Sequence, residues 1–364
     1  MDSSVTPPKK DLDTWLSTWP NVHGQFRFLV TRLQRRKVVG SLQCAKMTIE
    51  LLKTVMGTCR WSTAAELMRI VKRVGKALID AQPLELVIGN IVRRILFLIR
   101  DEHANKLRED RARHGLATTS LSEDGEAADE LNVAVPQLRM AVMEAIGELQ
   151  LELDNAYGEI CELALEHIHA NEVILTVGRS RTVEKFLKEA AERRRIFEVI
   201  VAESAPTLAG REMAKSLAAG GIETTVISDC AVYAIMARVN QVLLPCRAMI
   251  ANGGLIAPCG GHMAALAAKE LSVPVVCVTG LFKLSPVYRH DQDAFNDLKS
   301  PSSLIPYPEA AAMAEGTVDI LNPAYDYVPP ELVDLYITNT GGHQTSYVYR
   351  LLGEYYHHDD SNLD

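Results

Sequence analysis

The feature that most constrains this sequence is a series of short apolar runs that alternate with amphipathic segments in its second half. The runs are rich in β-branched residues, as buried strands are, and they are Val173–Val177, Glu198–Ala202, Glu223–Ile227, Val242–Leu244 and Val273–Val278. Between them, Thr182–Glu192 and Arg211–Ala219 have the apolar spacing of helices. This alternation predicts an α/β fold with a doubly wound, mainly parallel, Rossmann-like sheet domain over residues 169–364.

An N-terminal helical domain is predicted over residues 1–168. Thr63 and Glu66 have the spacing of a capping box, and apolar residues then recur every three or four positions. Residues 112–135 are rich in small and acidic residues, and we expect a mobile acidic loop because few large apolar side chains are present to offset the entropy of ordering. Residues 136–168 are expected to form a long connecting helix.

Charge and cysteine usage exclude several classes of protein. The chain has 38 Lys and Arg against 46 Asp and Glu, a net charge of −8, whereas a nucleic-acid binder needs clustered positive charge. The 7 cysteines never form a CxxC pair, so neither a disulfide framework nor a zinc site is indicated. No apolar run reaches about 18 residues, and the polar N-terminus does not resemble a signal peptide. We therefore expect a cytoplasmic protein of the reducing cytosol, with no direct nucleic-acid or membrane partner.

One strand of the predicted sheet runs through a glycine-rich turn into a helix. Ligands of parallel sheets bind at the carboxyl ends of strands. Gly260 and Gly261 precede a helix that begins near His262, and its amide groups would suit a small anion such as phosphate. The alternative is that the glycines serve only the tight turn. No GxGxxG motif follows the first strand, where Gly178 begins the segment GRSR, so no cofactor is predicted.

Other reactive residues near this pocket have structural explanations. Cys246 and Cys259 have no histidine and carboxylate visible beside them and are expected to be small core residues. Asp229 follows a strand and is expected to cap the next helix. His167 and His169 are two positions apart and lie on different helical faces, so no metal site is predicted.

Five segments in a fixed order carry a specific resemblance that covers nearly the whole chain. They are VGRSRT, AESAPTLAGREMA, GIETTVISDCAVYAIM, ANGGLIAPCGGHMAALAAK and NPAYDYVPPELV. This order is similar to the shared family of translation initiation factor 2B regulatory subunits (alpha, beta and delta) and methylthioribose-1-phosphate isomerases. Within the family, segments such as RWSTAAELMRIVKRVGKALIDAQP and LEHIHANEVILTVGRSRTVEKFLKEA are similar to those of the beta type.

The resemblance implies that this chain has no catalytic residues. The isomerases use a cysteine and an aspartate as acid and base, and here Gly178 stands in the place of the cysteine and Arg247 in that of the aspartate. Glycine cannot transfer a proton, and arginine stays protonated. Ala205 replaces an arginine that holds phosphate. What remains would be a vestigial pocket made of Gly178, Arg247, Asn252, Gly253, Gly260 and Gly261.

The function implied by the resemblance is regulatory. Such a subunit scaffolds the regulatory core of the exchange factor that replaces GDP with GTP on initiation factor 2, and helps to sense phosphorylation of the alpha subunit of initiation factor 2. The expected partners are the alpha, delta, gamma and epsilon subunits and initiation factor 2 itself. Two alternatives are a sugar-phosphate isomerase, disfavoured by Gly178 and Arg247, and a metabolite-binding regulator with no translation partner.

Two groups of residues are candidate contacts. The polar segment around His167, His169 and Asn171 lies at the predicted domain junction, and we expect it at a subunit interface, with the delta subunit as the partner. The basic residues Arg69, Arg93 and Arg94 are candidate contacts with initiation factor 2. For the arginines, the alternative is pairing inside the helical domain.

Overall fold

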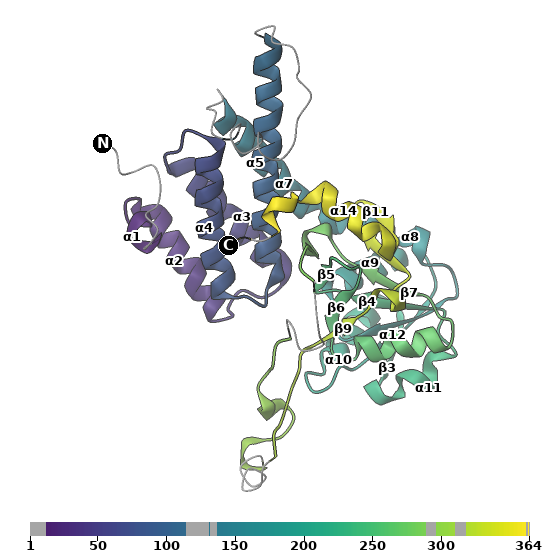
Figure 1. Ribbon diagram of the computed structural model, residues 1–364. Coiled ribbons are helices and arrows are strands. Elements are labelled where there is room, and N and C mark those ends of the chain that lie inside the picture. Colours follow the sequence, from purple (N-terminus) through teal and green to yellow (C-terminus); the bar gives the residue numbers. More distant parts are fainter. Residues whose placement is uncertain are drawn as a thin grey trace. The chain divides into compact units, whose positions relative to one another are not determined.

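The computed structural model describes residues 12–113, 131, 137–288, 296–309, 318–361 and 363. The chain divides into two units, which are coloured along the sequence in Figure 1. We call Met1–Asp154 together with Leu352–Asp364 the helical unit, and Asn155–Leu351 the α/β unit. The predicted fold class, a helical N-terminal part followed by a mainly parallel sheet with helices, is confirmed.

The boundary between the units differs from the predicted position at residues 168 and 169. Asp154 pairs with Lys46 of the helical unit, whereas Ile160 and Ala164 belong to the apolar core of the α/β unit. The last residues of the chain also belong to the helical unit, because side chains of that unit hold them, as described below for Asp360. The chain therefore passes from one unit to the other twice.

The helical unit is built from long amphipathic helices. They are α1 (Leu12–Leu16), α2 (Pro20–Gln34), α3 (Ser41–Thr58), α4 (Ala64–Ala81), α5 (Leu86–Arg113) and the first part of α7 (Leu138–Glu162). The backbones of α4 and α5 approach closely, since a Cβ on Gly75 would lie 2.6 Å from Val92 Cγ1. Among the described residues, no helix has the length and apolar character needed to cross a bilayer.

The predicted start of α4 is present with one change. Thr63 is the N-cap, and its Oγ1 accepts a hydrogen bond from Glu66 N at 3.3 Å. The return bond of Glu66 Oε2 comes from Ser62 N at 2.9 Å. Burial raises the pKa of Glu66, but hydrogen bonds from Ser62 and Thr63 outweigh burial, and the net pKa is lowered. The carboxylate is therefore held in its charged form at the positive end of the helix.

Two predictions about the middle of the chain have different outcomes. The mobile loop predicted over residues 112–135 lies outside the described residues, except that 112 and 113 are the end of α5 and 131 is in a turn. The predicted connecting helix is divided: α7 ends at Glu162, and α8 (Ala164–His167) follows. Leu163 N donates to Ile160 O at 3.3 Å, a short-range bond that tightens the chain at this break.

The main sheet of the α/β unit contains all five predicted strands. Its strands are β1 (Val173–Val177), β2 (Glu198–Ala202), β3 (Glu223–Ile227), β4 (Gln241–Pro245), β7 (Val275–Val278), β10 (Leu335–Thr338) and β11 (Gly341–His343). The order is β11-β10-β7-β4-β1-β2-β3, and every pair is parallel except β10 with β11. The crossover helices include α9 (Arg181–Glu192) and α10 (Ala209–Ala219), close to their predicted ranges.

A second sheet was not predicted from the sequence. It contains β5 (Ala248–Ile250), β6 (Leu255–Pro258), β8 (Leu284–Ser285) and β9 (Tyr325–Val328), in the order β8-β5-β6-β9. The strands are short, and β6 pairs antiparallel with β9, which follows it only after a long stretch of chain. The glycine-rich turn of the predicted pocket leaves this sheet at the end of β6 and enters α12 (Gly261–Glu270).

Candidate functional site

The ends of β1 and β2 lie side by side, at the place where the sequence predicts a pocket. Gly178 follows β1 with a φ of +66°, and its N–H donates to Ala202 O at 3.2 Å. A Cβ at this position would lie 3.3 Å from both Cβ and Oγ of Ser204. The glycine at position 178 therefore fits the left-handed backbone conformation and the close approach of Ser204.

The helix N-terminus predicted to bind an anion is occupied by a carboxylate of the chain itself. Asp326, on β9, accepts hydrogen bonds through Oδ2 from Gly260 N at 2.7 Å and from His262 N at 3.2 Å. These are amide groups at the start of α12, where a negative charge is favourable. Asp326 thus accepts the hydrogen bonds that we predicted from the sequence for a bound phosphate.

Asp229 accepts hydrogen bonds from a second pair of backbone amides at the same edge of the sheet. Its Oδ1 accepts from Ser204 N at 2.9 Å, and its Oδ2 accepts from Ala205 N at 2.7 Å. The expectation that Asp229 caps the next helix needs correction, since its carboxylate contacts the loop after β2. Two internal carboxylates therefore occupy the backbone donors of this pocket.

Cys259 is close enough to both carboxylates to feel their charge and is not an activated nucleophile. Burial raises the pKa of its thiol to about 11, and the charge and hydrogen bond of Asp326 and the charge of Asp229 act in the same direction. The reactive form of cysteine is the thiolate. At neutral pH, Cys259 is therefore a protonated thiol, although it is half-buried and not the core residue that was expected.

Cys246 has a more polar environment than a simple core residue. It is 6% exposed, and the buried Lys283 donates through Nζ to Cys246 O at 2.7 Å. Burial raises the pKa of Cys246, but hydrogen bonds from Cys277 and Thr279 and the charge of Lys283 outweigh burial and lower the pKa. The interior position of Cys246 restricts its access to any solute.

The remaining residues of the predicted pocket organise the second sheet. Arg247 stacks on the ring of Tyr325, 4.4 Å from its centroid, and donates to the hydroxyl of that tyrosine. Asn252 donates to Tyr327 Oη at 2.6 Å. Gly253 has a φ of +83°, and a Cβ there would lie 2.8 Å from Thr345 O. These contacts give Arg247, Asn252 and Gly253 a structural role.

The candidate subunit contacts lie around the end of α8. His169 and Asn171 are exposed, and Asn171 N donates to Ile196 O at 2.7 Å from a left-handed backbone conformation. His167 is half-buried, and burial followed by the charge of His169 lowers its pKa. The exposed side chains of His169 and Asn171 are accessible to a partner, and the predicted interface stays a prediction.

The arginines predicted to contact initiation factor 2 divide into two groups. Arg93 is 9% exposed, and its guanidinium donates to Asp360 O at 3.1 Å and to Ser361 O at 3.0 Å. Arg94 donates to Tyr355 O and stacks on the Tyr355 ring. These contacts favour the alternative, in which both arginines pair inside the helical unit. Arg69 is exposed and remains a candidate contact.

An exposed apolar surface was missed by the sequence analysis. Tyr233 on α11 (Val232–Met236) is 59% exposed, and Met263 and Leu266 on α12 are 43% and 52% exposed. The two helices pack against each other. We call these three residues the α11–α12 face. The sequence feature that could have indicated this surface is the i,i+3 spacing of Met263 and Leu266, which places both residues on one side of their helix.

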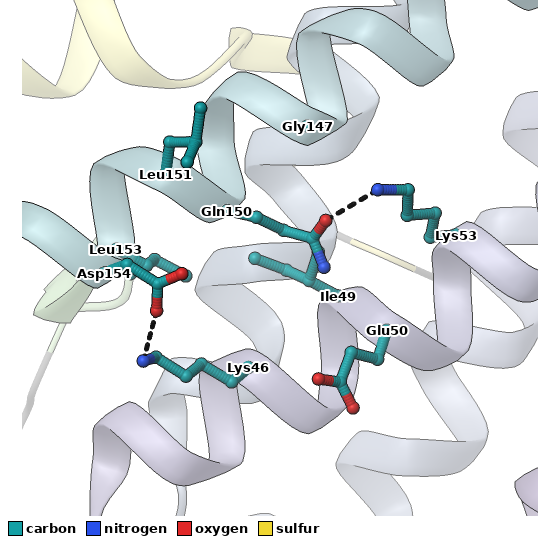
Figure 2. A pocket seen from close by; sticks show the side chains of 9 residues that line it. All are labelled: Lys46, Ile49, Glu50, Lys53, Gly147, Gln150, Leu151, Leu153 and Asp154. Carbon is teal, nitrogen blue, oxygen red and sulfur yellow. Dashed lines mark hydrogen bonds and ion pairs between the residues drawn. The ribbon is translucent and has the colours of Figure 1, made fainter.

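A groove between α3 and α7 in the helical unit was also missed. Its volume is about 330 Å³, and Figure 2 shows its lining, which includes Ile49 and Leu153. Lys46 pairs with Asp154, and Lys53 donates to Gln150 Oε1 at 2.7 Å. Because each lysine of the lining has a partner in the groove, this hollow does not have the chemistry of an anion site.

Comparison with known proteins gives a consistent assignment. The model of the initiation factor 2 subunit family matches residues 37–345. The chain is 42% identical to translation initiation factor eIF2B subunit beta of Dictyostelium discoideum, over 90% of this chain and 94% of that protein. A chain in the crystal structure of the tetrameric eIF2B-beta2-delta2 complex from C. thermophilum is 29% identical, with a TM-score of 0.70, and the match covers 95% of this chain and 100% of that one.

An enzyme is also among the relatives. Ribose 1,5-bisphosphate isomerase of Pyrococcus furiosus is 26% identical over 86% of this chain and 88% of that protein. Its identity is well below that of the Dictyostelium discoideum beta subunit. The resemblance predicted from the sequence is confirmed: the chain belongs to the initiation factor 2 subunit family, and within that family it is similar to the beta subunits.

Proposed function

We propose that the chain is a non-catalytic regulatory subunit of a 2B-type exchange factor, the complex that replaces GDP with GTP on initiation factor 2. The observation that carries the proposal is the occupied pocket: the amides of Gly260 and His262 bind Asp326, and those of Ser204 and Ala205 bind Asp229. A phosphate in this pocket would have to displace two carboxylates and would be repelled by both. This arrangement supports a subunit that keeps the sheet and does not bind phosphate through these amides.

The alternative function, a sugar-phosphate isomerase, is less supported. Proton transfer on a sugar phosphate needs an acid and a base within hydrogen-bond reach of the substrate. Gly178 has no side chain, Arg247 is engaged with Tyr325, and the Cys259 thiol has a raised pKa of about 11. Each of these observations disfavours the isomerase, and together they favour a scaffold role.

The α11–α12 face supports assembly with a related subunit. Exposed apolar residues that gather on adjacent helices are typical of protein interfaces. The similar chain of known structure is part of a beta2-delta2 complex. We infer that this face, as well as the segment of His169 and Asn171, is a candidate contact with a delta-type subunit. The other proposed partners are the alpha, gamma and epsilon subunits and initiation factor 2, especially its alpha subunit. Cytosolic localisation follows from this role.

Co-expression with a delta-type subunit tests the proposal. The double variant Met263→Asp/Leu266→Asp would place two carboxylates in a desolvated contact, at an expected cost of about 1–3 kcal/mol of association or more. Ile196→Asp is the matched variant, because Ile196 is 75% exposed in the same unit but lies beside Asn171. Mass photometry gives the assembly state, and circular dichroism confirms folding of each variant.

The two variants separate the possible outcomes. Loss of assembly in Met263→Asp/Leu266→Asp alone supports the α11–α12 face, and loss in Ile196→Asp alone moves the interface to the segment of His169 and Asn171. If the unaltered chain forms no complex with delta-type, gamma-type or epsilon-type subunits, the proposed function is wrong.

A further inference from the structure

Three potential metal ligands meet on an exposed turn near the C-terminus. The turn is the short 3₁₀ helix η6 (His358–Asp360), preceded by His357. His357, His358 and Asp359 each offer one ligand atom, and these atoms all lie within 4.8 Å of one another.

The ligand atoms lie close enough for side-chain rotations to bring them onto a single small cation. His358 Nε2 lies 3.0 Å from Asp359 Oδ1, and His357 Nδ1 lies 3.5 Å from Asp359 Oδ2. Tetrahedral Zn²⁺ with bonds of about 2.0–2.1 Å holds its ligand atoms roughly 3.3–3.4 Å apart. The two observed separations lie on either side of this value but end on different oxygens of Asp359, so side-chain rotations have to bring one of these oxygens and the two imidazole nitrogens onto one ion.

The hydrogen bonding of His357 leaves its ligand nitrogen in a suitable form. Asp359 N donates to His357 Nδ1 at 3.3 Å, so this nitrogen carries a lone pair instead of a proton. Imidazole binds metal through such a lone pair. The bond is long, and replacing it by a metal bond would leave the Asp359 amide close to solvent.

The surroundings leave the outer side of the turn open. The side chains of His357, His358 and Asp359 are 33%, 71% and 53% exposed, so water can supply a fourth ligand. The nearby cation Arg100 lies 3.8 Å from Asp359 Oδ2 but binds the next residue, Asp360, through Nε at 3.1 Å. Asp360 points inward and offsets this charge, while Asp359 points outward.

We propose that His357, His358 and Asp359 form a surface binding site for one divalent first-row transition metal ion of the imidazole-binding kind, such as Zn²⁺. Two imidazoles and one carboxylate are a donor set that Zn²⁺ accepts, with water in the remaining position. The bound ion links three consecutive residues of the segment Leu352–Asp364. Binding is therefore expected to stabilise the folded form of the helical unit.

The test is calorimetric titration of the full-length chain with Zn²⁺ after removal of metal with a chelator. All proteins carry Cys230→Ser, because Cys230 is an exposed thiol that would bind Zn²⁺ elsewhere. The variants are His358→Gln and Asp359→Asn, alone and together. His169→Ala is the matched control, since His169 is an exposed histidine outside the turn. Thermal unfolding of the same proteins is measured with and without Zn²⁺.

We expect one Zn²⁺ per chain and a loss of affinity of at least about tenfold in each variant, the smallest effect usual when a metal's coordination is disturbed. The control should bind as the parent does, and Zn²⁺ should raise the unfolding temperature of the parent but not of the double variant. Equal affinity in the parent and the double variant, or no binding by the parent, would overturn the proposal. His358 and Asp359 are exposed, so the variants should fold.

Discussion

The substitution Asp360→Asn should destabilise the helical unit strongly, although Asp360 lies only a few residues from the end of the chain. Its side chain is 0% exposed, and it accepts from Arg100 Nε at 3.1 Å and Arg100 Nη2 at 3.3 Å and pairs with Lys72 Nζ at 2.7 Å. Burial raises the pKa of Asp360, but the hydrogen bonds and charges of Arg100 and Lys72 outweigh it and lower the net pKa. The carboxylate is therefore bound as an anion.

The expected magnitude follows from these contacts. Breaking a buried ion pair costs about 3–5 kcal/mol, because the remaining charge loses its partner. Lys72 and Arg100 are 27% and 18% exposed and recover some hydration, and asparagine keeps one acceptor oxygen. We therefore expect a loss of about 2–4 kcal/mol in the free energy of unfolding, from a total that is typically 5–15 kcal/mol.

The assay can report on this unit alone. The 3 tryptophans of the chain, Trp15, Trp19 and Trp61, all lie in the helical unit, so tryptophan fluorescence during urea unfolding follows that unit. The urea midpoint should fall by about 1 M or more, given slopes of about 1–3 kcal/mol/M. Asp359→Asn is the matched control, since Asp359 is 53% exposed, and it should change the free energy by less than about 0.5 kcal/mol without added metal.

The pH dependence gives an independent check. The pKa of Asp360 is lowered in the folded state, so its contribution is fully present above the unfolded pKa of about 3.9 and is lost as pH falls further through the folded pKa. The difference between wild type and Asp360→Asn should therefore be constant near neutral pH and shrink below about pH 4. Equal midpoints for Asp360→Asn and Asp359→Asn at pH 7 would refute the reasoning.

Three further predictions concern packing, thiol chemistry and the occupied pocket. Gly75→Ala should destabilise the helical unit by about 1–3 kcal/mol in urea unfolding, because the new Cβ would lie 2.6 Å from Val92 Cγ1. An unchanged urea midpoint would mean that α4 and α5 move apart to accommodate the new methyl group. Cys230 is exposed and should react with a thiol reagent at neutral pH. Cys259, with a pKa of about 11, should react only as the pH approaches that value. Equal reaction rates at pH 7 in single-cysteine variants would contradict the assigned environment of Cys259. Asp326→Ala should free the amides of Gly260 and His262. Phosphate should therefore raise the unfolding temperature of this variant more than that of the wild type at matched ionic strength. An equal rise in both proteins would show that Asp326 does not block an anion.

The main sheet was predictable because each of its strands is a local signal. Val173–Val177, Glu198–Ala202 and Glu223–Ile227 are apolar or β-branched runs with helices between them, and the structure has strands at these residues. The second sheet was not predictable in this way. Leu255 pairs with Val328, and neither short run has a period that separates it from a loop.

The residues that occupy the amides of the pocket are far away in the sequence, so their contacts could not be predicted from it. The glycines before α12 were identified from the sequence, but the residue that occupies their amides, Asp326, is remote in the chain. Arg93 presents the same difficulty, since its partners are the carbonyl groups of Asp360 and Ser361. A charged residue on a predicted helix is assigned to the surface by default, and only the fold shows that the C-terminal segment covers this one.

We propose that this sheet keeps the framework of a sugar-phosphate enzyme without its chemistry. The most direct test is to incubate the purified chain with ribose 1,5-bisphosphate, the substrate named for the Pyrococcus furiosus relative, and to follow the phosphorus NMR spectrum. We predict no change in the spectrum and no line broadening that indicates binding, because Asp326 and Asp229 occupy the amide donors. Turnover by the wild-type chain that Asp229→Ala abolishes would contradict the claim.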